Sequence, residues 1–324
     1  MGHIPEPEST PNGPAYEGRL LVRPDDEVVD QGAGFDVRTL LSRRGLLGLI
    51  GVGAGATLVA CAATSGTSPS SGATTSSTPT GSAASTAAST GALPAGEIPD
   101  ETAGPYPGDG SNEVDGQVAD VLEQSGIVRE DLRTSIGGGD AVEGVPLTFT
   151  LTITDMANGD APFAGVAVYA WHCDAQGRYS MYSDDVLDQT WLRGVQVADA
   201  DGKVTFTSVV PGCYAGRWPH IHFEVYPDQG SIVDSANAIA TSQLAFPEDM
   251  VTTVYARSEY PGSSQNLSQV SLATDNVFGE DSAALQMAAI TGDADAGYTA
   301  TLTARVDTTT APTGGSAPSR GGRR

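Results

Sequence analysis

Lysine is almost absent from this sequence of 324 residues, in which Lys203 is the only one. Lysine and arginine together number 16 against 40 acidic residues, which gives a formal net charge of −24. A chain of this charge repels phosphate backbones, which argues against nucleic acid as a partner. Cysteine is scarce too: three cysteines exclude a four-cysteine zinc ribbon and a disulfide-dense miniprotein. The length allows one or two domains.

Charged residues are also missing between Arg44 and Glu97, and this interval opens with an apolar stretch that ends at Cys61. The stretch contains five glycines and is shorter than the ~20 residues that a membrane-spanning helix needs. Paired arginines directly before it resemble a twin-arginine export signal, and its last four residues resemble a lipobox, in which Cys61 would receive lipid. A buried core helix is the weaker alternative because of the glycines. We expect a signal over residues 41–61, and whether Cys61 is lipidated stays open.

Three other segments have the composition of unfolded chain: a polar leader over residues 1–40, a Ser/Thr/Ala/Gly-rich linker over 62–96, and a polar tail over 309–324. The linker suits a flexible tether between an anchor and a domain. We therefore expect an exported protein that is extracellular or anchored on the outer face of the cytoplasmic membrane. Membrane contact is expected only through a lipid on the signal's cysteine.

Residues 97–308 remain as one folded domain, and their pattern is mostly that of β-strands. Short apolar or alternating runs are separated by Gly, Pro and Asp, which favours an all-β fold with a two-sheet β-sandwich core. A short helix is expected after Pro247. The expected strands lie at residues 145–153, 165–171, 203–209, 220–226, 239–246 and 298–306.

The pair His220-Ile221-His222 lies in one of these strands. Because strand side chains alternate, both imidazoles face one side, ~6.5 Å apart along the strand, which allows both to bind one ion. Two histidines on a polar sheet face are the plainer alternative. The sequence has no HExxH, GxSxG or P-loop motif, and a dispersed Ser-His-Asp set stays open.

Several short motifs are spread between Thr102 and Phe246. They are Gly104-Pro105-Tyr106-Pro107, Val128-Arg129-Glu130-Asp131-Leu132-Arg133, Gly177-Arg178-Tyr179, Leu192-Arg193-Gly194, Asp201-Gly202, Pro211-Gly212-Cys213-Tyr214 and Arg217-Trp218-Pro219-His220-Ile221-His222-Phe223. In combination they resemble the intradiol ring-cleavage dioxygenases, and the stretch from Gly165 to Phe223 resembles the core of that family.

The resemblance implies that Tyr179, Tyr214, His220 and His222 bind one non-haem ferric ion per chain. These residue types suit the ion, because Fe(III) is a hard acid and two tyrosinate oxygens are hard, anionic donors. A trivalent ion can also offset the cost of deprotonating tyrosine, whose ordinary pKa is ~10. The plainer interpretation of the two tyrosines is an aromatic residue at a strand end.

The resemblance also implies the reaction: O2 cleaves the ring of a catechol-type aromatic diol to give a cis,cis-muconate-type diacid. Tyr214 is then the tyrosine that the substrate displaces and that accepts a substrate proton. Arg217 matches the arginine that stabilises negative charge on the ring, although a surface salt bridge is an alternative. Gln243 resembles a glutamine that supports the site, and a strand-edge polar residue is nearly as good an interpretation.

Four residues near these motifs have weaker assignments. Tyr106 lines the substrate pocket by resemblance, or belongs to a rigid turn. His172 is expected to be structural and not a fifth ligand. Cys173 and Cys213 stand close to the two tyrosines in sequence, so they form either a disulfide or two buried free thiols.

Two features depart from the family's pattern. Tyr169 stands where relatives often carry an acidic residue, and the linker replaces the helical dimerisation region of the intracellular enzymes, so the oligomeric state stays open. Two other functions remain as alternatives. One is a non-catalytic exported β-sandwich that binds a ligand or partner. The other is a different His-x-His metal enzyme, which would use Zn or Cu and would not need both tyrosines.

Overall fold

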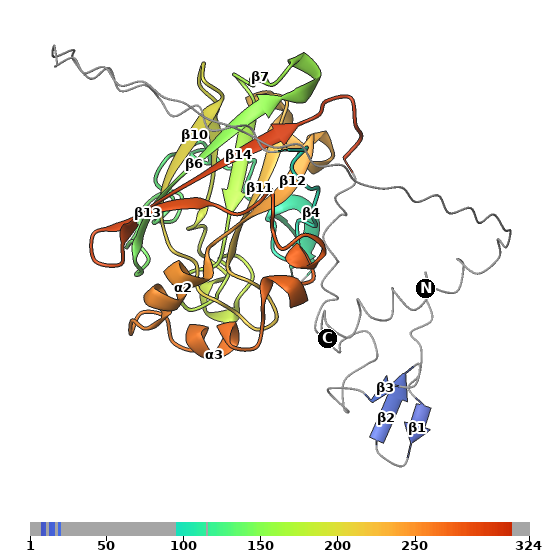
Figure 1. Cartoon of the computed structure of the whole chain (residues 1–324), viewed down its shortest axis with the longest axis vertical. Helices are drawn as coiled ribbons and strands as arrows, with labels where there is room; N and C mark the ends of the chain where they lie inside the picture. The colour runs from blue at the N-terminus through green and yellow to red at the C-terminus, as the bar shows by residue number, and fades with distance from the viewer. Residues whose placement is uncertain (1–7, 11–12, 17–18, 21–94, 115, 313–324) are drawn as a thin grey trace, which may run out of the picture. The chain divides into compact units, whose positions relative to one another are not determined.

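The computed structural model describes residues 8–10, 13–16, 19–20, 95–114 and 116–312, drawn in colour in Figure 1. The chain divides into two compact units, Met1–Ser89 and Thr90–Arg324. The predicted export signal with Cys61 and most of the predicted linker and tail lie outside the described residues. Within the described part of the chain, no helix is long and apolar enough to cross a membrane.

The N-terminal unit contains a small antiparallel sheet in the order β1-β2-β3. Its strands are β1 (Glu8–Thr10), β2 (Gly13–Tyr16) and β3 (Arg19–Leu20). The expectation that residues 1–40 lack regular structure is wrong for these strands. Strands of two to four residues are too short to show an alternating pattern.

The second unit is built on two sheets, and the first has the order β10-β6-β14-β13 with β7 paired to β6. Apolar residues alternate with threonine along its central strands, so one face is buried and the other is open to solvent. The β6–β14 pair is parallel and the others are antiparallel. The strands are β6 (Pro146–Asp155), β7 (Ala161–Pro162), β10 (Lys203–Val209), β13 (Ala289–Asp293) and β14 (Gly297–Val306).

The second sheet is antiparallel, in the order β12-β11-β8-β9. Its strands are β8 (Ala167–Trp171), β9 (Arg193–Val197), β11 (His220–Tyr226) and β12 (Ala240–Ala245). Every residue of β8, β11 and β12 is buried, because one face packs against the first sheet and the other is covered by loops. The predicted all-β two-sheet sandwich is confirmed.

Shorter elements surround the two sheets (Figure 1). A hairpin of β4 (Asp109–Val114) and β5 (Gln117–Asp120) covers the second sheet, together with irregular chain around it. The helices are α2 (Glu248–Tyr255) and α3 (Ser263–Leu267), and α2 begins after Pro247 as predicted. The 3-10 turns are η2 (Met156–Asn158), η3 (Asp184–Val186), η4 (Gln229–Val233), η5 (Ser235–Asn237), η6 (Leu272–Thr274) and η7 (Phe278–Glu280).

Two of the three clusters of buried side chains in the described residues lie against the faces of the second sheet. The larger one fills the space between the sheets and includes Phe149 and Phe206, whose rings stack 4.9 Å apart. The second lies on the outer face of the β12-β11-β8-β9 sheet and includes Tyr169, Trp171 and Tyr179. Because side chains alternate along β11, His220 and His222 point toward this second cluster and away from the space between the sheets.

Candidate metal centre

The four predicted ligands converge at one point on the outer face of the second sheet. The Tyr179 and Tyr214 hydroxyls are 3.5 Å apart, and the Tyr214 hydroxyl is 3.3 Å from His220 Nε2. His220 Nε2 is in turn 3.0 Å from His222 Nε2. Donor atoms that share a centre at ~2 Å lie ~3–3.5 Å from one another. The spacing of the four atoms therefore fits a single metal ion.

Local backbone geometry brings the two tyrosines together. Asp174 accepts hydrogen bonds from the amides of Gln176 and Arg178, which folds the chain before Tyr179 into a tight turn. Gly177 in this turn has φ of +79°, and a Cβ there would lie 3.2 Å from the Tyr214 Cβ. A glycine is thus needed both for the left-handed backbone and for the close approach of the second tyrosine.

The imidazole hydrogen bonds indicate which nitrogens are available. His220 Nδ1 donates to the Trp218 carbonyl, so its Nε2 carries a lone pair that points into the cluster. The His222 ring stacks on Trp171 at 4.8 Å, and its buried Nδ1 has no partner among the described residues. When Nδ1 of His222 carries the proton, two Nε2 lone pairs face each other at 3.0 Å. A cation between them removes this repulsion.

Burial keeps all four side chains uncharged when no metal is bound. It raises the pKa of Tyr179 well above its ordinary value, with the neighbouring Tyr214 adding to the effect. It raises the pKa of Tyr214 to about 12, although the charge of Arg217 opposes the shift. It lowers the pKa of His220 to about 3 and that of His222 well below its usual range.

The donor set therefore suits a hard, highly charged ion. No group of three or more His, Cys, Asp or Glu side chains in the described residues could hold a metal. An ion at this site must therefore use the tyrosine oxygens, and it must be charged strongly enough to displace their protons. Ferric iron meets both conditions, whereas a divalent zinc ion is usually held by thiolates, imidazoles and carboxylates.

Arg217 lies beside the cluster and is held on two sides. Its Nε donates to Asp275 Oδ2 at 2.9 Å, and its Nη2 donates to Gln243 Oε1 at 2.6 Å. The Arg217 side chain is 13% exposed and that of Asp275 is fully buried, so this ion pair is not a surface salt bridge. Gln243 lies on β12, the edge strand of the second sheet, but it is fully buried and bonds the Thr102 carbonyl.

Asp275 is a residue that the sequence analysis missed. Besides Arg217, it accepts hydrogen bonds from the amides of Trp218 at 2.7 Å and Val277 at 2.8 Å. It thereby fixes the segment that leads into His220. No motif marks Asp275, because it meets its partner arginine from 58 residues away.

Tyr106 lies at the edge of the cluster. Its ring centroid is 4.8 Å from that of Tyr179 and 5.3 Å from that of Tyr182. Gly104, two residues earlier, has φ of +73°, and a Cβ there would lie 3.2 Å from His222 Cε1. The segment therefore passes directly against the ligands, as expected for one wall of a substrate pocket.

His172 and the two cysteines stand apart from the donor set. His172 Nε2 bonds Ser208 Oγ at 2.7 Å and Nδ1 bonds the Cys173 carbonyl at 2.8 Å, so neither nitrogen is available to an ion. Cys173 and Cys213 are buried free thiols, so the disulfide alternative is wrong and the free-thiol alternative holds. The two sulfurs face different carbonyls, those of Gly212 and Arg217.

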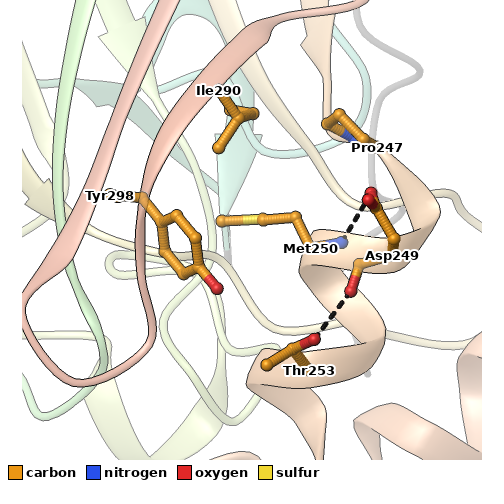
Figure 2. A pocket seen from close by; sticks show the side chains of 7 residues that line it. Pro247, Asp249, Met250, Thr253, Ile290 and Tyr298 are labelled. Atoms are coloured by element: carbon orange, nitrogen blue, oxygen red, sulfur yellow. Dashed lines mark hydrogen bonds between the residues drawn. The ribbon is translucent and has the colours of Figure 1, made fainter.

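A separate pocket lies between α2 and the β13–β14 hairpin (Figure 2). Its volume is about 410 Å³, and Met250, Ile290 and Tyr298 contribute apolar surface to it. None of the predicted site residues lines this pocket. The chemistry predicted from the sequence therefore belongs to the tyrosine–histidine cluster and not to this cavity.

Comparisons with known proteins relate this chain to dioxygenases. Residues 122–257 match the sequence model of the family described as Dioxygenase. An intradiol ring-cleavage dioxygenase from Tetranychus urticae has a similar structure, with 23% identity and a TM-score of 0.51 over 68% of this chain and 98% of that one. A second dioxygenase crystal structure has 23% identity and a TM-score of 0.52, and covers 67% and 97% of the two chains. The match to the Dioxygenase family model over residues 122–257 and the shared fold of the two structures agree with the resemblance to the intradiol ring-cleavage dioxygenases that the motifs predict.

Proposed function

We propose that this protein is a non-haem Fe(III) dioxygenase that cleaves the ring of a catechol-type diol with O2 to a cis,cis-muconate-type diacid. The observation that carries this proposal is a series of short distances that links the four donor atoms: Tyr179 to Tyr214 at 3.5 Å, Tyr214 to His220 at 3.3 Å, and His220 to His222 at 3.0 Å. One ferric ion per chain would be held by Tyr179, Tyr214, His220 and His222. When bound, it would withdraw electron density from the diol and activate the ring toward O2.

Tyr214 is the side chain placed to move a proton. Its hydroxyl contacts both Tyr179 and His220, and Arg217 acts on it electrostatically. Because burial raises the pKa of Tyr214 to about 12, its oxygen holds a proton strongly when no ion competes for it. We infer that Tyr214 Oη accepts a proton from a substrate hydroxyl as the diol binds.

Arg217 supplies the fixed positive charge. Its guanidinium is held by Asp275 and Gln243 and needs no reorganisation when negative charge develops on the substrate ring. Tyr106 provides an aromatic wall against Tyr179, and the buried position of the cluster excludes bulk water from the reacting ring.

Turnover in the presence of labelled oxygen tests the proposed reaction. We expect the full chain, loaded with iron, to consume one O2 per catechol and to place label from ¹⁸O2 in both new carboxyl groups of a linear diacid. The Tyr179→Phe variant serves as the control that lacks one ligand. Formation of a quinone or of hydrogen peroxide, with no ring-opened product, would show that the site performs other chemistry.

We also propose that the protein is exported and retained at the membrane through a lipid on Cys61, on the basis of the twin-arginine and lipobox patterns alone. Replacing Arg43 and Arg44 by lysine should keep the chain in the cytoplasm. The Cys61→Ala variant should move it from the membrane fraction into the medium. Export of both variants at the wild-type level and to the same fraction would contradict the proposal.

A further inference from the structure

Residues 104–108, which we call the pocket segment, depend on side chains for their hydrogen bonds. The segment contains Pro105 and Pro107, which have no amide N–H, so it cannot join a strand ladder. Its three central carbonyls are each bonded by a side chain. Asn112 donates to Pro105 at 3.0 Å, Arg193 to Tyr106 at 3.0 Å, and both Arg193 and Tyr169 to Pro107 at 2.6 Å.

Arg193 contributes the most to this arrangement. It is 1% exposed, and all its N–H groups donate to neutral oxygens: the two carbonyls of the pocket segment, the carbonyl and hydroxyl of Ser180, and the Tyr169 hydroxyl. No carboxylate in the described residues forms an ion pair with it. Burying a charge without a counter-ion costs free energy. The hydrogen bonds that Arg193 donates are charge-assisted and therefore stronger than neutral ones, which offsets part of this cost.

The same guanidinium connects the pocket segment with the backbone beside Tyr179. Ser180 follows the predicted ligand Tyr179, and Tyr106 belongs to the pocket segment. Arg193 thus bonds the backbone next to both rings of the Tyr106–Tyr179 contact, whose centroids are 4.8 Å apart. Tyr169 completes the arrangement, since its hydroxyl bonds both the Pro107 carbonyl and Arg193 Nη1.

On the basis of the proposed function, we propose that Arg193 and Tyr169 are positioning residues that hold Tyr106 against Tyr179 and thereby set how tightly the aromatic diol binds. They contact neither the predicted ligands' donor atoms nor Arg217. The Tyr169 hydroxyl bonds only the pocket segment and Arg193, so we expect its effect on turnover to pass through the position of the Tyr106 ring and to fall on KM and not on kcat.

Tyr169→Phe is the mildest test, because it removes two hydrogen bonds and keeps the ring. We expect KM for catechol to rise ~3–10-fold, as the loss of one or two hydrogen bonds allows, while kcat and the visible absorption of the iron-loaded protein are unchanged. Arg193→Lys should raise KM further. Tyr260→Phe is the matched control: its buried hydroxyl also bridges two backbone groups, those of Val145 and Val210, and it should leave KM unchanged.

A double-mutant cycle shows whether the effect passes through Tyr106. In a Tyr106→Ala background, Tyr169→Phe should no longer change KM, because the ring that it positions is gone. The proposal is wrong if Tyr169→Phe leaves KM at the wild-type value, if its effect persists without the Tyr106 side chain, or if Tyr260→Phe raises KM equally.

Hydrogen exchange of the iron-free full chain separates this proposal from the proposed function. The Gly108 amide, which donates to the Tyr182 hydroxyl at 2.7 Å, should exchange faster in Tyr169→Phe than in wild type or Tyr260→Phe. Equal exchange in all three proteins would overturn the positioning role. This measurement needs neither iron nor turnover. A protein that fails to cleave catechol would contradict the proposed function, while the exchange rate of the Gly108 amide would still test the positioning role.

Discussion

The two sheets of the sandwich carry different chemistry because they are covered differently. The β10-β6-β14-β13 sheet has one open face, and its outward positions are mostly threonine, such as Thr150 beside Thr205. The β12-β11-β8-β9 sheet is covered on both faces, and its outer face carries His220 and His222. A sheet with an open face leaves polar side chains hydrated, whereas a covered sheet makes any polar side chain costly unless a partner satisfies it.

Each sheet also holds one ion pair between arginine and aspartate, and the two pairs illustrate this difference. Arg305 on β14 pairs with Asp160, whose side chain is 23% exposed, while Arg217 before β11 pairs with the fully buried Asp275. Water can replace a lost partner in the first pair but not in the second. The covered sheet is therefore where the proposed site has its fixed charge and its neutral imidazoles.

The largest effect is expected from removing a ligand on the covered sheet. His222→Ala should abolish stoichiometric iron binding and lower kcat/KM at least ~1,000-fold, equivalent to ~4 kcal/mol of barrier. Iron content and turnover of the purified full chain measure this. If the variant kept one iron per chain, the site would lie elsewhere.

Breaking the buried ion pair should have the next largest effect. Asp275→Asn leaves Arg217 without its counter-charge, and we expect kcat to fall ~10–100-fold with iron retained, which is typical when a supporting partner is lost. The equivalent change on the open sheet, Asp160→Asn, is the control and should leave kcat unchanged. Equal losses of kcat in the two variants would contradict the difference between the covered sheet and the open sheet.

A third prediction uses the pH dependence of stability. Burial lowers the pKa of His172, next to β8, to about 4, so the unfolded chain binds this proton at a higher pH than the native one. Stability from this group is present above pH ~6.5 and is lost as the pH falls toward 4, by ~2 kcal/mol between pH 7 and 5. Urea unfolding of the iron-free chain at both pH values should show a smaller loss for His172→Gln. If His172→Gln and the wild type lost the same free energy of unfolding between these pH values, the lowered pKa of His172 would be wrong.

The smallest effect is expected on the open face. Thr150→Val removes a hydroxyl that bonds Thr205 at 2.9 Å where water is available to replace it. The free energy of unfolding should change by less than ~0.5 kcal/mol, and kcat and KM should not change. A larger loss of activity would indicate that the open sheet also contributes to function.

The sequence predicts the strands whose side chains alternate or are β-branched, and it singles out four side chains that the structure brings together. Strands β4 and β9 were missed because they contain Gly, Asp, Asn or a buried arginine, which do not read as strand residues. Asp275 and the hydrogen bonds of Arg193 were missed for a different reason. They depend on contacts between segments far apart in the chain, which no local pattern encodes.

The central claim is that Tyr179, Tyr214, His220 and His222 hold one ferric ion that a catechol can reach. Its most direct test is the iron content and visible absorption of the purified full chain, before and after anaerobic addition of catechol. The account predicts about one iron per chain, a red colour from tyrosinate bound to ferric iron, and a shift of the band when catechol binds. A colourless protein that binds no stoichiometric iron after reconstitution would contradict it.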